Sequence, residues 1–139
     1  MTEQLFGDAS IGWHDDHILR IKHLEDWEGE DNLDTAKEVV KGIRSFTADK
    51  PFIGMLIVLS SLYKEKEILD FFRHQDVSEI ARAAVIPSFA ARLIGNMYLK
   101  LAKGKPNEKG RYVPVKLFTN EEKAIVWLQQ QVNKHQSTD

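Results

Sequence analysis

The sequence predicts a single α/β domain in which helices pack on a mixed β-sheet of about five strands. Two short runs near the N-terminus alternate apolar with polar residues, which is typical of strands with one exposed face. Residues 53–59 are almost continuously apolar, as in a central strand that is buried on both faces. Segments with helical spacing separate the later strands. The expected order β-β-α-β-α-β-α-β-α therefore implies right-handed parallel crossovers.

The two opening strands are predicted to form a hairpin. The apolar residues that share a strand face are Ala9, Ile11 and Trp13 in the first run and Leu19 and Ile21 in the second. The intervening residues 14–17 read His-Asp-Asp-His, and Asp favours tight turns. In a two-residue hairpin His14 and His17 would be cross-strand neighbours, close enough to share a metal ion. Neither CxxC nor HExxH spacing accompanies them, so we favour a solvated turn and predict no metal site.

The elements after the hairpin follow from apolar spacing and from capping and helix-breaking residues. Pro51 and Pro87 end segments, because proline restricts the residue before it. Thr119 and Glu122 match a capping box at the start of the last helix. The expected elements are a helix over 33–46 capped by Asn32 or Asp34, the strand at 53–59, a helix over 64–73, a short helical turn at 77–82, a strand at 83–86, a helix over 89–103 capped by Ser88, a strand at 113–117 and a helix to about 134.

Length and composition exclude several classes of protein. The chain has 139 residues, which fits one domain with its core at about 8–132, and no cysteine, which excludes disulfides, thiolate metal sites and a cysteine nucleophile. The N-terminus lacks the basic and apolar segments of a signal peptide, so we expect a cytoplasmic protein without a transmembrane segment. A pI near 6.2 disfavours nucleic acid as a partner.

Charge is distributed unevenly along the chain. Residues 1–34 hold ten acidic residues against two basic ones, a net charge of −8. Residues 88–118 hold seven basic residues against one acidic residue, a net charge of +6. Such asymmetry either steers a charged partner or places the two segments close enough to neutralise each other.

The C-terminal third carries a family resemblance. Its residues are Ala84-Val85-Ile86, the helix segment 91–96, Pro114 to Thr119, Glu121-Glu122-Lys123-Ala124 and Trp127-Leu128. In these residues and in element order, about 8–132 resembles the STAS domain of anti-sigma-factor antagonists and the core of CRAL-TRIO (SEC14-type) lipid carriers. The closer likeness is to small bacterial STAS/SEC14-like (SpoIIAA-like) domains. The resemblance implies a regulatory interaction domain or a lipid-type carrier.

One departure from the STAS pattern concerns phosphorylation. STAS antagonists carry a phosphorylatable serine in an Asp-Ser-Ser/Thr-Gly type motif after the central strand. This chain has Leu59-Ser60-Ser61-Leu62 at that place, without the acid and the glycine. We therefore expect Ser60 and Ser61 to end the strand and begin a loop.

Two regions supply candidate binding residues. In the helix over 89–103, the spacing predicts a core stripe of Ala90, Leu93, Ile94, Met97 and Leu101. The opposite, basic face carries Leu99, with Phe89 at its border, which is typical of a dimer contact, a membrane-surface contact, the mouth of an apolar pocket or an ordinary surface. The helix over 64–73 carries adjacent phenylalanines. The candidate ligand- or partner-binding residues are Phe71, Phe72, Phe89, Arg92, Leu99, Lys100 and Lys103.

No set of residues in the sequence assembles a nucleophile, a base and an orienting group, so the sequence predicts no catalytic residue and no cofactor. The first hypothesis is a non-enzymatic regulatory domain that binds a protein partner. The second is a carrier or sensor of a small apolar or amphipathic ligand, held between the sheet and the helices at 64–82. An edge strand or the Leu99 face favours a homodimer.

Overall fold

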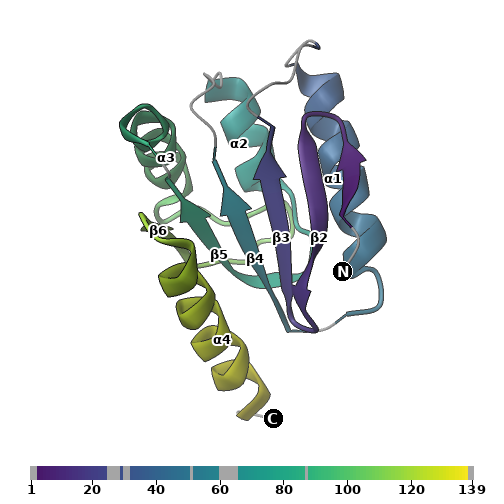
Figure 1. The fold of residues 1–139 in the computed structure, drawn as a ribbon, viewed down its shortest axis with the longest axis vertical. Helices are drawn as coiled ribbons and strands as arrows, with labels where there is room; N and C mark the ends of the chain where they lie inside the picture. Colours follow the sequence, from purple (N-terminus) through teal and green to yellow (C-terminus); the bar gives the residue numbers. More distant parts are fainter. Residues whose placement is uncertain are drawn as a thin grey trace.

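The computed structural model describes residues 3–24, 29, 32–50, 52–59, 66–86 and 88–137. Within them the chain forms one sheet of six strands with four helices packed on it (Figure 1). The strands are β1 (Gln4–Phe6), β2 (Ala9–Asp15), β3 (Ile18–His23), β4 (Ile53–Val58), β5 (Glu79–Val85) and β6 (Val115–Phe118). The helices are α1 (Leu33–Thr47), α2 (Lys66–His74), α3 (Phe89–Ala102) and α4 (Glu121–Ser137). The predicted α/β class is confirmed.

The spatial order of the strands follows the sequence, β1-β2-β3-β4-β5-β6. Strands β1 to β3 form an antiparallel meander, and β3 to β6 pair in parallel. The sheet has one strand more than the sequence predicts. The additional strand, β1, is a three-residue edge whose Leu5 is 72% exposed, so it lacks the apolar alternation that would reveal it.

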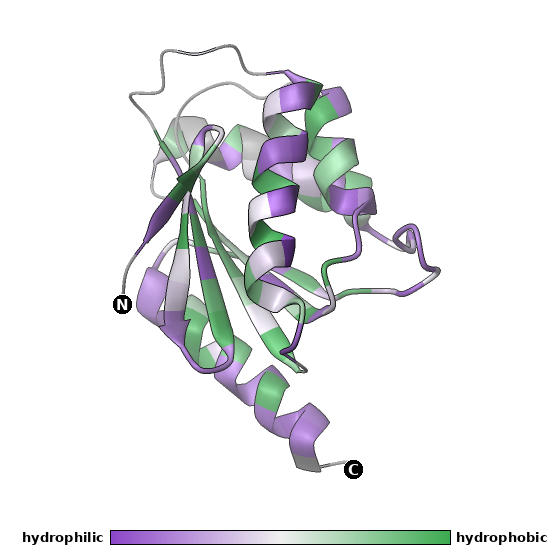
Figure 2. Cartoon of the chain, turned by 90° about the vertical axis from the view of Figure 1, so that its right-hand side faces the viewer, coloured by the Kyte–Doolittle hydropathy of each residue, from purple (hydrophilic) through white to green (hydrophobic). Residues whose placement is uncertain are grey.

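The helices cover the two faces of the sheet unequally. Consecutive parallel strands joined by crossovers of one hand place all the crossover helices on the same face. Helices α1, α2 and α3 accordingly share one face, and α4, which follows the last strand, covers the other (Figures 1 and 2). On the α4 face, Ala124 and Leu128 are fully buried against Leu56 and neighbouring apolar residues of the sheet.

Most of the segment 77–82, predicted to be a helical turn, belongs instead to β5, which begins at Glu79. All seven residues of this strand are buried, and they pair with both β4 and β6. Glu79 and Arg82 are the charged residues of this segment. In the structure these two charges neutralise each other inside the domain, so the segment can occupy the middle of the sheet. The short strand expected at 83–86 is its second half.

One of the two caps predicted for α1 is confirmed, whereas the cap predicted for α4 is wrong. Asn32 caps α1, because its Oδ1 accepts a hydrogen bond of 3.0 Å from the Thr35 N–H. The capping box predicted at Thr119 is wrong by one residue. Asn120 caps α4, its Oδ1 accepting from the Lys123 N–H at 3.1 Å, since β6 continues to Phe118. In the described residues no helix is long and apolar enough to cross a membrane.

Candidate functional site

An apolar cavity of about 90 Å³ lies between the sheet and the helices α1, α2 and α3. Every second residue of a strand points to the same face of the sheet, so Met55 and Ile57 of β4 both line the cavity. Ala84 of β5 lies on the same side. The helices close the cavity with Val39, Val40 and Ile43 of α1, Leu69 and Phe72 of α2 and Tyr98 of α3. The lining is almost entirely apolar, so the cavity suits an apolar occupant.

Two buried ionisable groups beside the cavity bind each other. His23, at the end of β3, has its Nε2 2.7 Å from Oδ2 of Asp8, and the Asp8 side chain is only 2% exposed. Both residues line the cavity. Because each lies against the other, their polarity is largely compensated within the protein.

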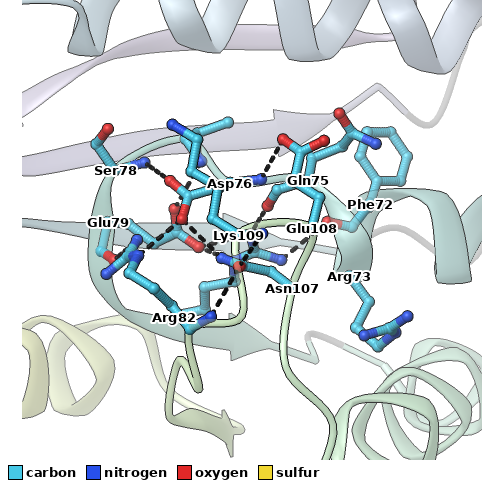
Figure 3. A network of polar contacts seen from close by, with 12 residues as sticks. Phe72, Arg73, Gln75, Asp76, Ser78, Glu79, Arg82, Asn107, Glu108 and Lys109 are labelled. Carbon is cyan, nitrogen blue, oxygen red and sulfur yellow. Dashed lines mark hydrogen bonds and ion pairs between the residues drawn. The ribbon is translucent and has the colours of Figure 1, made fainter.

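Arg82 lies on the other side of the cavity, and its guanidinium donates hydrogen bonds to other groups of the protein (Figure 3). Its Nε donates to Glu79 Oε1 at 2.5 Å, and its Nη2 donates to the carbonyl of Gln75 at 2.7 Å. Its Nη1 donates both to the carbonyl of Phe72 at 2.9 Å and to the Tyr98 hydroxyl at 2.6 Å. Arg82 therefore ties α2 and α3 to the sheet, and its donors are not available to a ligand.

A β-bulge explains how Glu79 and Arg82 meet. Residues three apart in a regular strand point to opposite faces. The register of β5 against β4 shifts here, since Ile53 pairs with Glu79 but Gly54 pairs with Ala81. The extra residue, Ile80, turns Glu79 to the side of Arg82. Both side chains are buried, 0% and 4% exposed. Burial alone would lower the pKa of Arg82, but the Glu79 carboxylate and the hydrogen bonds with Tyr98 and Glu79 outweigh it and raise the pKa.

A second group of polar contacts joins this pair to the segment that follows α3. The Asp76 carboxylate accepts from Arg111 Nε at 2.7 Å, from Asn107 Nδ2 at 2.9 Å and from the Ser78 N–H at 2.8 Å (Figure 3). Arg111 also donates to the carbonyl of Glu79 at 2.9 Å. We use the name Arg82 network for the following residues: Asp76, Ser78, Glu79, Arg82, Tyr98, Asn107 and Arg111. Burial alone would raise the pKa of Asp76, but the hydrogen bonds from Arg111, Ser78 and Asn107 lower it to about 2.

The two adjacent phenylalanines of α2 have different surroundings. Phe72 lines the apolar cavity, and Phe71 packs at the margin of the core beneath α1. Their rings meet edge to face, with centroids 5.9 Å apart. Of the seven candidate residues, Phe72 alone lines the cavity among the residues that the structure describes.

The candidate residues of α3 are divided between other surfaces. Phe89 is 81% exposed, and Arg92 lines a hollow near the start of the helix. Leu99 and Lys103 border a shallow groove at the far end, and Lys100 is exposed. The predicted core stripe is wrong at Leu93, which is 65% exposed. Tyr98 of the same helix is buried instead, and its hydroxyl accepts a hydrogen bond from Arg82.

The remaining predicted residues do not form a site. Asp15 pairs with Ile18 across the hairpin, and a register shift leaves His14 without a cross-strand partner, so His14 and His17 are not cross-strand neighbours. Asp15 Oδ1 accepts from the backbone N–H groups of His17 and Ile18. In the described part of the chain, no three His, Asp or Glu side chains gather as metal ligands. Ser60 and Ser61 lie outside the described residues.

Sequence reasoning missed Glu79, Arg82 and Tyr98, which hold the cavity wall in place. One signal was available. Arg82 stands inside a run that is otherwise apolar from Ile80 to Ile86, and Glu79 comes directly before that run. A buried ion pair in a central strand accounts for this pattern.

The comparisons with known proteins place the chain in a family. Residues 12–132 match the family described as "Domain of unknown function (DUF7793)". The chain belongs to this family. Its matched region begins within β2 and ends within α4, so it includes the Arg82 network and all the residues that line the apolar cavity except Asp8 and Ala9. No curated protein and no solved structure shows significant similarity to the chain.

Proposed function

We propose that this chain is a non-enzymatic regulatory domain of the cytoplasm that senses or carries a small apolar molecule in the cavity beneath α1, α2 and α3. The observation that carries the proposal is the cavity itself, which is lined by apolar side chains of seven different elements. Ligand sites in small domains are typically apolar hollows with few polar groups. The polar groups beside this one are already bound to each other.

The size of the cavity limits the ligand. An apolar cavity of about 150 Å³ stays dry and takes up benzene. At about 90 Å³, the cavity here suits a molecule of a few heavy atoms, and a long lipid chain would require the helices to move apart. The proposal therefore favours a small apolar or weakly polar compound over a membrane lipid.

The Arg82 network offers a route from the cavity to the surface. Phe72 contacts the cavity with its ring, while its backbone carbonyl accepts a hydrogen bond from Arg82. Arg82 is connected in turn, through Glu79, to Arg111 in the exposed segment before β6, and Arg111 also donates to Asp76. A ligand that displaces α2 would disturb these hydrogen bonds and would thereby alter the conformation of the segment at 104–111.

Filling the cavity should abolish binding. Ala84 is 2% exposed and faces the cavity from β5, so Ala84→Leu places additional carbon atoms where a ligand would lie. We expect benzene, followed by ¹H–¹⁵N NMR, to shift the amides of Val39, Ile57 and Phe72 in the wild type. Ala84→Leu should weaken that binding at least about tenfold, a loss of about 1.4 kcal/mol.

Ala102→Leu is the matched control, because Ala102 lies on α3 away from the cavity. It should leave benzene binding unchanged. The proposal fails if benzene moves no cavity resonance in the wild type, or if Ala84→Leu binds it as the wild type does while remaining folded.

A second candidate function is a protein-interaction domain, and the exposed apolar face of α3 favours it. Phe89 and Leu93 are 81% and 65% exposed and, being four residues apart, lie on the same side of the helix. We propose a second copy of the chain as the partner, because the basic segment 88–118 complements the acidic segment 1–34. The resemblance to STAS domains supports this candidate.

For this candidate we expect the wild type to dimerise in sedimentation equilibrium at low salt and the double variant Phe89→Ser/Leu93→Ser to be monomeric. Leu5→Ser, at a residue 72% exposed on β1, is the control for the removal of an exposed apolar side chain. A wild type that stays monomeric throughout the concentration range would exclude the dimer.

A further inference from the structure

After β5 and after the neighbouring strand β6, the chain turns toward opposite faces of the sheet. Alternate residues of β5 face opposite sides of the sheet: Ala84 lines the cavity under α1–α3, and Ala83 and Val85 pack in the core beneath α4. Helix α3 follows β5 on the first side, and α4 follows β6 on the second (Figure 1). In open parallel sheets, a ligand crevice forms at the carboxyl ends of strands where such a switch occurs. Here that point lies between the ends of β5 and β6.

A hollow of about 340 Å³ lies at this point. We name it the switch-point crevice, and it is lined by Ile86, Leu117 and Phe118 at the strand ends and by Arg92, Asn96, Thr119 and Lys123. Gly95 allows α3 to lie this close to β5, because a Cβ there would be 2.8 Å from Ile86 Cγ2. The volume is within the range of about 300–1,000 Å³ that is usual for small-molecule sites.

The crevice brings together two cations without a carboxylate. Arg92 comes from the first turns of α3 and Lys123 from the first turn of α4, and among the described residues neither forms an ion pair. Asn96 lies one helical turn from Arg92 on the same side and adds an amide. The nearby carboxylate of Glu121 is directed elsewhere, since it accepts from Arg20 Nε at 2.5 Å. Two like charges that face one hollow are stabilised by an anion between them.

From this geometry we propose that the switch-point crevice binds a small organic anion through a phosphate or carboxylate group. The guanidinium of Arg92 supplies a planar fork for such a group, and the ammonium of Lys123 adds a point charge. Apolar atoms of Leu117 and Phe118 line the same hollow and would contact the organic part of the ligand. The site is separate from the apolar cavity, so this inference does not depend on the proposed function.

Phenyl phosphate is a suitable probe, because it combines the anionic group with a small apolar ring. In ¹H–¹⁵N NMR we expect it to shift the amides of Arg92, Asn96, Thr119 and Lys123 saturably. The double variant Arg92→Gln/Lys123→Gln should weaken binding at least about tenfold. Both side chains are exposed, so the variant should keep the fold and the melting temperature of the wild type.

Lys103→Gln is the matched control, since Lys103 is an exposed cation on the segment that follows α3, outside the crevice. It should bind phenyl phosphate as the wild type does. Sedimentation with phosphatidylglycerol vesicles, but not with phosphatidylcholine vesicles, that is lost in the double variant alone would support the site and identify a lipid headgroup as the anion. The proposal is overturned if neither phenyl phosphate nor anionic vesicles bind, or if Lys103→Gln weakens binding as much as the double variant.

Discussion

Replacing Arg82 by methionine should lower the free energy of unfolding by about 3–5 kcal/mol, because it leaves the Glu79 carboxylate buried without its cation. The Glu79 side chain is 0% exposed, and the same change removes the hydrogen bonds that hold the carbonyls of Phe72 and Gln75. Urea denaturation followed by circular dichroism measures the loss. Since small domains have only about 5–15 kcal/mol in total, the variant should be close to unfolding.

Two further variants separate the contributions within this pair. Arg82→Lys keeps the charge but not the fork of donors, so it should lie between the wild type and Arg82→Met. Glu79→Gln/Arg82→Met should be more stable than Arg82→Met alone, because no uncompensated carboxylate remains. Arg92→Met, at an exposed arginine, should change stability by less than about 0.5 kcal/mol. A stability of Arg82→Met within about 1 kcal/mol of the wild type would show that the Arg82 network does not stabilise the fold.

Replacing Asp76 by asparagine should remove a pH-dependent part of the stability. The pKa of Asp76 falls from 3.8 to about 2 on folding, so the folded state favours the ionised carboxylate. The stability from this shift, about 2 kcal/mol, is complete above pH 4 and is lost as the pH falls through 2. We expect Asp76→Asn to be less stable by about that amount at pH 7, and the difference should shrink between pH 4 and pH 2.

Asp70→Asn is the matched control, because Asp70 also pairs with an arginine, Arg73, at 2.8 Å, but its side chain is 48% exposed. Solvent screens such a pair, so its loss should cost less than about 1 kcal/mol. Urea midpoints measured from pH 2 to pH 7 compare the two variants. A constant difference between Asp76→Asn and the wild type across this range would contradict the assignment of the shift to Asp76.

The apolar cavity and the switch-point crevice lie at different parts of α3. Tyr98, in the middle of the helix, lines the cavity, whereas Arg92 and Asn96, near its start, line the crevice.

The sequence by itself determined the class of the fold and most of its elements. The apolar run at 53–59 predicted β4, helical spacing predicted α1, and alternation predicted the hairpin, because burial of one face or of both faces leaves a periodic pattern in a single segment. The cap of α1 was narrowed to Asn32 or Asp34 for the same reason, since a capping hydrogen bond joins residues close in sequence, and the structure has Asn32. The sequence also named Phe72 as a candidate, from two adjacent phenylalanines on a short helix, and Phe72 lines the apolar cavity.

The tertiary structure alone decided the sites. Arg82 was predicted to lie in a helical turn, but in the structure it lies in a strand between β4 and β6, and its partners are Glu79 on its own strand, Phe72 of α2 and Tyr98 of α3. Arg92 and Lys123 meet in one crevice only because α3 and α4 leave neighbouring strands toward opposite faces. Local periodicity reports which side of a segment is buried. The partners of a buried charge, and the side chains that share a hollow, depend on contacts between segments far apart in the chain, which leave no periodic pattern in any one of them.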